Sequence, residues 1–400
     1  MKNYRYRPID NDIKIRYIST EFNDSDLGPV LRGHNKKVII TIDNQAYYFK
    51  YDTEKEKLGN IQKPIASSFC SWLTRRYGGN FVVDIPGEAV VHTGGKENYD
   101  THLKGVFSKS YRDDPNVIAT FTLDQVLRPG ENENFKYTNE ERVFSSVQSS
   151  IIRLISFIGD KNNQQHPLTS KLKYLQEDMK QIEEDLVSIV TLDYLFLNND
   201  RHTENIEFAI VVDPDGEYHL VVSPVFDNDR TLGLDKTESQ ILDSCSSQAK
   251  REIYVNYPSD LKYVILDDDI NRETAMKRNF ANNFNSDRIA EYVAKRSFDE
   301  NGRIDREKLS QNPIYNLFEN YKNLNIRQEF FQYLGELIGI DYPLELTPEQ
   351  EPEFLEQFNK ITNSTLSMLH VQELSENFEI RQKCLTKSMA KYVSTSCSTM

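Results

Sequence analysis

The sequence lacks the features that would place it in several large protein classes. Its 400 residues include four cysteines, which are widely separated and form no CxxC pair, so we expect neither a disulfide framework nor a cysteine zinc site. No stretch approaches the roughly 18 apolar residues of a membrane span, and the N-terminus has no apolar core of a secretory signal. These absences favour a cytoplasmic protein, and they fit equally well with an effector exported without a classical signal.

Positive charge is also scarce. The chain has 48 Lys and Arg against 62 Asp and Glu, a formal net charge of −14, and no basic patch stands out. Nucleic acid and anionic membranes repel such a polyanion, so we expect neither as a partner. With 38% hydrophobic and 28% charged residues the composition is that of a globular protein. At this length it predicts two or three domains or one large two-lobed enzyme.

The first 112 residues are predicted to form a small unit rich in strands. β-Branched and aromatic residues on both sides of Asp43-Asn44 predict a hairpin from Val38 to Tyr51. A polar turn with glycines precedes this hairpin, and a helix from Ile65 to Tyr77 follows it, ending at Gly78-Gly79. Further short strands are expected at residues 81–84, 89–92 and 105–110.

The remainder of the chain is predicted to be mainly helical, which makes the fold class α+β. Apolar residues recur at spacings of three and four in residues 145–158 and 172–197. Two apolar strands, Ile206 to Val212 and Tyr218 to Phe226, flank an Asp-Pro-Asp-Gly turn and predict a second hairpin. The polar end of the chain, near residues 386–400, is expected to be a disordered tail.

Three oxygen-bearing side chains are expected to converge at the second hairpin. Asp200 lies in the loop after the long helix, Asn205 lies at the mouth of the hairpin, and the returning strand brings Asp227 back near Asn205. Phosphoryl transfer needs such a set, because a carboxylate orients the acceptor hydroxyl while an amide and a second carboxylate hold magnesium. The pattern predicts Asp200 and Asn205 as catalytic residues, and Asn205 and Asp227 as magnesium ligands.

The residues beside this set are interpreted as its support. Arg201 and His202 are expected to fix the loop as buried, hydrogen-bonded side chains, and they are not assigned acid–base roles. Asp193 and Asn198 lie on the delivering helix and are expected to brace the loop from behind.

The N-terminal unit supplies candidates for binding nucleotide phosphates. Lys50 ends a predicted strand, and the turn from Gly28 to Lys37 has backbone N–H groups suited to covering phosphates. A strand-loop-strand unit with a lysine, then a helix, then a helical half bearing Asp, Asn and Asp is the order of a two-lobed kinase. The DRHxxN spacing at residues 200–205 differs from HRDxxxxN, which excludes the common eukaryotic protein kinases.

The chain resembles the HipA-like kinases, including the compact cell-translocating kinase A type. The resemblance implies a two-lobed, HipA- or PI3-kinase-like fold with an N-lobe at residues 1–112 and a C-lobe at residues 113–400. It rests on motifs that follow one another between about residues 28 and 232, namely Gly33-His34-Asn35-Lys36-Lys37, Tyr48-Phe49-Lys50, Gly105-Val106-Phe107-Ser108-Lys109, Asp193 with Asn198, Asp200-Arg201-His202-Thr203-Glu204-Asn205 and Ser223-Pro224-Val225-Phe226-Asp227-Asn228.

The resemblance also implies roles and an activity. Asp200 would be the catalytic aspartate, Asn205 and Asp227 would bind magnesium, and Lys50 would contact the α- and β-phosphates. The implied activity is that of a serine/threonine protein kinase that uses ATP and Mg²⁺ and has a protein hydroxyl as acceptor. The Ser/Thr-rich tail, residues 394–399, offers acceptors for autophosphorylation. The nucleotide-binding loop would include Gly33, His34, Asn35 and Lys37.

Departures from the family pattern leave alternatives open. Residues 62–77 contain no Asp or Glu, so the acidic partner expected for Lys50 is missing from the first helix, and only Glu54 and Glu56 precede it. Residues 28–37 contain no Ser or Thr for the loop regulation of HipA. We also expect no counterpart of the antitoxin-binding subdomain of HipA, because Gly33 comes early, so toxin–antitoxin membership is not implied. The alternatives are a phosphoinositide-type lipid kinase and a nucleotide-binding pseudokinase or interaction module.

Overall fold

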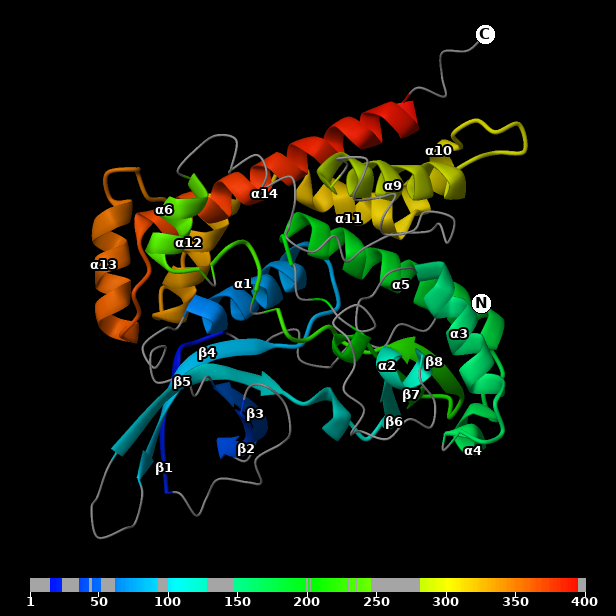
Figure 1. Ribbon diagram of the computed structural model, residues 1–400, viewed down its shortest axis with the longest axis horizontal. Helices are drawn as coiled ribbons and strands as arrows, with labels where there is room; N and C mark the ends of the chain where they lie inside the picture. Colours follow the sequence, from blue (N-terminus) through cyan, green and yellow to red (C-terminus); the bar gives the residue numbers. More distant parts are fainter. Residues whose placement is uncertain are drawn as a thin grey trace.

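The chain folds into two parts, which Figure 1 shows side by side. The N-lobe is a curled five-stranded sheet with helix α1, and the C-lobe is mainly helical with a three-stranded sheet. The predicted α+β, two-lobed fold class is therefore confirmed. The computed structural model describes residues 15–23, 36–42, 45–51, 62–92, 100–127, 147–163, 165–198, 201, 203–228, 230–234, 236–245 and 281–394.

The N-lobe sheet has the strand order β1-β4-β5-β3-β2. β1 pairs with β4 in parallel, and the other neighbours pair antiparallel. The predicted hairpin is confirmed as β2 and β3, and the sheet buries alternate apolar side chains such as Val38, Ile40 and Phe49. The strands are β1 (Ile18–Asn23), β2 (Lys36–Ile42), β3 (Gln45–Tyr51), β4 (Asp84–His92) and β5 (Asp100–Lys109).

Helix α1 (Gln62–Tyr77) joins the two lobes. Its apolar side chains are almost all buried, and the Phe69 ring packs against Phe330 and Tyr333 of the C-lobe at centroid distances of 5.0 and 5.2 Å. The helix ends as predicted at Gly78, which has a φ of 105° that glycine adopts readily. Because one hydrophobic core runs from the sheet through α1 into the C-lobe, the lobes are held in a defined relation.

The C-lobe helices pack around the long helix α5 and the C-terminal helix α14, which cross the upper half of Figure 1. The two helices predicted at residues 145–158 and 172–197 are confirmed as α3 and α5. The helices are α2 (Leu123–Leu127), α3 (Val147–Gly159), α4 (His166–Thr169), α5 (Leu175–Leu195), α6 (Glu238–Cys245), α9 (Ala281–Arg296), α10 (Arg306–Gln311), α11 (Pro313–Tyr321), α12 (Ile326–Leu337), α13 (Glu351–Thr362) and α14 (Met368–Met389).

The second sheet has the order β6-β7-β8 and begins after the short 3-10 helix Tyr111–Asp113. Its strands are β6 (Val117–Thr122), β7 (Glu207–Val212) and β8 (Tyr218–Val222), so the second predicted hairpin is confirmed. The returning strand is shorter than predicted, because Pro224 has no N–H to continue the ladder. Beyond it Val225 forms an isolated bridge with Phe81, and this bridge brings the end of the hairpin against the N-lobe.

The prediction of a disordered tail from about residue 386 is wrong for the residues that the structure describes. Helix α14 continues to Met389, and a π-helical turn follows at Ala390–Ser394. The reason is tertiary packing, since Leu385 and Met389 are buried and Lys391 forms an ion pair of 3.0 Å with Asp287. Residues 395–400 lie outside the described residues.

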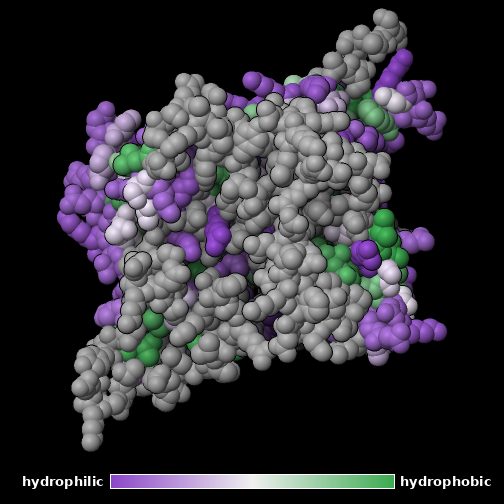
Figure 2. Space-filling model, in the orientation of Figure 1, coloured by the Kyte–Doolittle hydropathy of each residue, from purple (hydrophilic) through white to green (hydrophobic). Residues whose placement is uncertain are grey.

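Helix α13 presents a mainly polar face outward, although Ile361 on it is exposed. Figure 2 shows hydrophilic residues over α13, whose apolar side chains Phe354, Leu355 and Phe358 are buried on the opposite side. Within the described part of the chain, no helix combines the length and apolar character that crossing a bilayer requires.

Candidate active site

The end of helix α5 sets the direction of the loop that carries the predicted catalytic residues. Leu197 has a left-handed φ of 51°, and the N–H of Asn198 donates to the carbonyl of Asp193 at 2.9 Å. This is a Schellman-type helix end in which a leucine takes the position usually held by glycine. Because Leu197 is buried, its packing holds the chain in this conformation.

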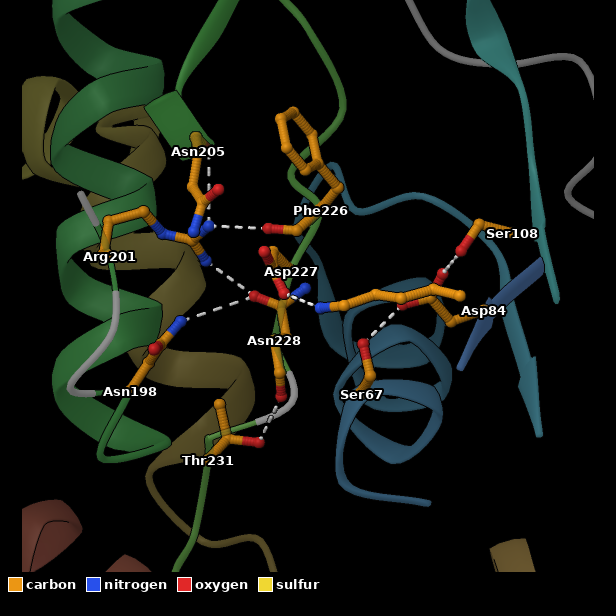
Figure 3. Close-up of polar contacts among 11 residues, drawn as sticks. Ser67, Asp84, Ser108, Asn198, Arg201, Asn205, Phe226, Asp227, Asn228 and Thr231 are labelled. Carbon is orange, nitrogen blue, oxygen red and sulfur yellow. Dashed lines mark hydrogen bonds and ion pairs between the residues drawn. The ribbon is translucent and has the colours of Figure 1, made fainter. Parts of the chain in front are cut away.

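Arg201 is the centre of a buried network behind the loop, drawn in Figure 3. Its guanidinium donates to both carboxylate oxygens of Asp193 at 3.0 and 3.1 Å, to the carbonyl of Phe226 at 2.7 Å and to Oδ1 of Asn228 at 2.6 Å. The side chain is fully buried, as predicted for a loop-fixing residue. The network therefore joins α5, the loop and the segment after β8 into one unit.

The braces predicted behind the loop belong to the same network. The side-chain amide of Asn198 donates to Asp193 at 2.9 Å, which confirms that these two residues support the loop. Burial raises the pKa of Asp193, and the charge of Arg201 acts against the rise. A buried charge is costly unless it is compensated, so this carboxylate and the guanidinium depend on each other.

Asn205 ends the 3-10 helix Thr203–Asn205, directly before β7, and is 5% exposed. The Thr203 hydroxyl donates to Asp124 at 2.9 Å and ties this turn to α2. Two residues further on, buried Glu207 accepts hydrogen bonds from Tyr111 and Arg112. The turn that carries Asn205 is thus held between α2 and the connection from the N-lobe.

Asp227 lies on the segment that returns from β8 and has a left-handed φ of 63°. Aspartate tolerates this conformation better than most residues, although it is uncommon outside glycine. The segment is held on the N-lobe side, since the Val225 N–H donates to the Asn80 carbonyl at 2.7 Å and the Val82 N–H donates to the Val225 carbonyl at 2.9 Å. Beyond it, the Thr231 hydroxyl donates to the Asn228 carbonyl at 2.9 Å.

The ammonium group of Lys50 forms an ion pair with the Asp227 carboxylate. The lysine comes from β3 of the N-lobe and the aspartate from the C-lobe, so the contact joins residues 177 positions apart. The two side chains are 14% and 20% exposed, which leaves this contact accessible from solvent. Figure 3 shows Asn205 and Asp227 on neighbouring parts of the C-lobe, with Asp227 toward the N-lobe.

Asp84 is a second acidic residue near this contact, and no sequence motif points to it. It begins β4, is 2% exposed and accepts hydrogen bonds from the hydroxyls of Ser67 and Ser108. Burial raises its pKa to about 6, the two hydroxyls and the charge of Lys50 oppose the rise, and Asp227 adds to it. No local pattern distinguishes Asp84 from a strand-end aspartate, because its role depends on which strands become neighbours.

Several predicted site residues lie outside the described residues. These are Gly33, His34 and Asn35 of the proposed glycine-rich loop, together with Asp200 and His202. Lys37 is described through its backbone, and its partner in the β2–β3 pair is Lys50. The described part of the chain therefore brings together Lys50, Asp227 and the Asn205 turn.

The oxygen donors at this place suit a magnesium ion in type. Mg²⁺ prefers carboxylate and carbonyl oxygens and usually takes one or two carboxylates, with waters and phosphate oxygens filling its octahedron. Asn205 and Asp227 supply such oxygens, although Lys50 already engages Asp227. Among the described residues, no three or more His, Cys, Asp or Glu side chains form a metal cluster, so the rest of the coordination would come from the nucleotide and water.

A separate groove of about 840 Å³ lies between α5, β8, α9 and α11. Its walls include Gly79 and Asn80, which follow α1, and Ser223, which follows β8. The site residues Lys50, Asp84, Asn205 and Asp227 do not line it. The groove has charged side chains of its own, including Lys180, Glu184 and Asp185, but none of them belongs to the predicted phosphate-binding motifs. The candidate active site is therefore the Lys50–Asp227 contact.

Comparison with one solved structure supports the fold. No protein-family model and no curated protein matches the chain. Among solved structures, the proinflammatory kinase CtkA of Helicobacter pylori aligns with a TM-score of 0.52 and 11% identity, over 96% of this chain and all of CtkA. HipA from a Shewanella oneidensis MR-1 toxin–antitoxin complex aligns with a TM-score of 0.36 and 13% identity, over 96% of this chain and 69% of HipA. The predicted resemblance is confirmed at the level of the fold, which this chain shares with the compact HipA-like kinase CtkA.

Proposed function

We propose that the protein is a HipA-like kinase that transfers the γ-phosphate of ATP to a serine or threonine hydroxyl of a protein. The observation that carries the proposal is the ion pair of Lys50 with Asp227, which places a lysine of the N-lobe sheet at the carboxylate after the β7–β8 hairpin. Two-lobed kinases bind nucleotide phosphates between such a lysine and such a carboxylate. The likeness of the fold to CtkA supports the same interpretation.

The described site residues would bind different parts of the Mg·ATP complex. Lys50 would move from Asp227 to the α- and β-phosphates, where its ammonium group balances their charge. The carboxylate of Asp227 and the amide oxygen of Asn205 would hold magnesium, which supplies further positive charge at the transferring phosphoryl group. The Arg201 network keeps the two magnesium-binding segments together, since it bonds to both of them.

The role of Asp200 in the proposed reaction comes from the family resemblance. It directly precedes Arg201, whose buried network fixes the start of the loop. We assign Asp200 to orient the acceptor hydroxyl and to accept its proton as the oxygen attacks the γ-phosphorus and the bond to ADP breaks. A protein acceptor is favoured over a phosphoinositide, because the net charge of −14 opposes binding to anionic membranes.

Intact mass spectrometry after incubation with ATP and Mg²⁺ tests the proposal. We expect the protein to gain phosphate on itself or on an added Ser/Thr protein substrate, and we expect Lys50→Met, Asp200→Ala and Asp227→Ala to abolish the gain. Asp215→Ala is the matched control, because Asp215 is an exposed aspartate at the tip of the same hairpin.

The other outcomes separate the alternative functions. Tight ATP binding without phosphate transfer would favour a nucleotide-binding pseudokinase, and transfer confined to phosphoinositide vesicles would favour a lipid kinase. Full activity in purified Asp227→Ala protein would rule out the assigned site.

A further inference from the structure

Helix α1 presents serines where the acidic partner of Lys50 was expected. It contains no Asp or Glu, and three serines on one side of it contact the start of β4. The Ser67 hydroxyl donates to the carboxylate of Asp84, and the Ser68 hydroxyl donates to its backbone carbonyl at 2.7 Å. The backbone N–H of Asp84 donates to the hydroxyl of Ser71 at 3.3 Å. The helix therefore holds both the backbone and the side chain of this aspartate.

The register of the sheet places Asp84 and Lys50 on one face. Asp84 on β4 is opposite Ser108 on β5, and Ser108 is opposite Tyr48 on β3. Lys50 is two residues after Tyr48, so its side chain leaves the sheet on the same face, toward α1. Figure 3 shows Asp84 on this side of the site, between Ser67 and Ser108.

The carboxylate of Asp84 is fixed in direction. Ser108 donates to its Oδ1 and Ser67 donates to its Oδ2, so the group cannot rotate without losing a hydrogen bond. At 2% exposure it has little contact with water. Leaving such a carboxylate without a cation nearby would be costly, and Lys50 is the cation whose charge acts on it.

We propose that Asp84 is the positioning residue of Lys50, a role that an acidic residue on the first N-lobe helix was expected to fill. In the ligand-free protein Lys50 contacts Asp227. When Asp227 binds the magnesium of a nucleotide complex instead, Asp84 holds the ammonium group of Lys50 at the phosphates. The inference rests on the proposed function, because it assigns a partner to the lysine of that same site. In this proposal Asp84 acts through Lys50.

A double-mutant cycle on the full chain tests this role. The dissociation constant of Mg·ATP is measured by calorimetry for the unsubstituted protein, Lys50→Met, Asp84→Asn and the double variant. We expect Asp84→Asn to weaken binding about tenfold on its own and to have no further effect when Lys50 is already methionine. Asp178→Asn is the matched control, since Asp178 is also buried and accepts from the Leu220 N–H at 2.9 Å, and it lies about four helical turns before Asp193 on α5. It should change the constant less than twofold.

Each outcome decides the proposal. Equal weakening by Asp84→Asn in the unsubstituted protein and in the Lys50→Met variant would show a structural role only and would overturn the inference while leaving the kinase proposal intact. No binding of Mg·ATP by the unsubstituted protein would overturn the proposed function and the inference with it.

If Asp84→Asn does not fold, the exchange variant Ser67→Asp with Asp84→Ser keeps one carboxylate and one hydroxyl at the contact. It should bind Mg·ATP within about threefold of the unsubstituted protein, and a folded exchange variant that has lost binding would overturn the inference.

Discussion

Lys50 and Asp227 form an ion pair between the N-lobe sheet and the segment that leaves the β7–β8 hairpin. Different side chains support the two residues of this ion pair. The aspartate is backed by the Arg201 network of the C-lobe, through Phe226 and Asn228. The lysine faces Asp84, which is held by serines of α1. The ion pair between Lys50 and Asp227 is therefore supported by hydrogen-bonded side chains in both lobes.

Replacing Lys50 by methionine removes the cation from this contact. Because both partners are partly buried, we expect the free energy of unfolding to fall by about 1–3 kcal/mol. We expect phosphate transfer to fall more than a hundredfold in the same variant, since the phosphates lose their lysine. Urea denaturation and the labelled-ATP assay measure the two effects. Lys173→Met is the control, because Lys173 is exposed and pairs with Glu217 on the surface; it should leave both quantities nearly unchanged.

Arg201 should be among the residues on which stability depends most. Arg201→Met leaves the buried Asp193 carboxylate without its cation, and breaking such a pair costs about 3–5 kcal/mol. Lysine should not replace it, because one ammonium group cannot reproduce the planar fork that reaches Asp193, Phe226 and Asn228. Urea unfolding of Arg201→Met, Arg201→Lys and the exposed control Arg306→Met tests this expectation. A loss below about 1 kcal/mol would show that Asp193 finds another partner.

The stability of the protein should depend on pH through Asp84. Its ordinary pKa is 3.8 and its pKa in the folded protein is about 6, so the folded state binds the proton more tightly. The resulting stabilisation is complete below about pH 4 and is lost as the pH rises through 6. A pKa difference of about 2 corresponds to about 3 kcal/mol.

The comparison of Asp84→Asn with the unsubstituted protein isolates this contribution. Asparagine does not titrate, so the unfolding free energy of the unsubstituted protein, relative to the variant, should fall by up to about 3 kcal/mol between about pH 4 and pH 7. Urea unfolding at constant ionic strength measures this difference. Parallel pH profiles of the two proteins would contradict the expectation.

Cys70 should be chemically inert in the folded protein. Its side chain is fully buried in α1, its sulfur lies 3.1 Å from the Thr231 hydroxyl, and burial raises the pKa of its thiol to about 12. Because the thiolate is the reactive form, we expect labelling by a thiol reagent at about pH 8 to be on the order of a thousandfold slower than for an exposed thiol. Peptide mapping of the labelled protein identifies the site, and labelling in guanidinium is the positive control. Fast labelling in the native state would mean that α1 and the Thr231 segment separate readily.

The local elements of this fold follow patterns that can be read along the chain. The hairpin of β2 and β3, helix α1 with its glycine end, and the hairpin of β7 and β8 were all predicted. The chain end was predicted incorrectly because a polar composition does not reveal that Leu385 and Met389 are buried on α14, which packs against α9. The same limit applies to Leu197, whose left-handed conformation no sequence rule favours.

Local patterns set which residue types lie at each end of the second hairpin and which strand carries the lysine, since periodicity and turn chemistry act over a few residues. Tertiary structure alone decided which acids surround Lys50. Asp84 reaches it through the pairing of β4 with β5 and of β5 with β3, and Asp227 reaches it through the bridge of Val225 with Phe81. These neighbours are 34 and 177 residues away along the chain. Their approach depends on strand order and on the shared core, which no local pattern encodes.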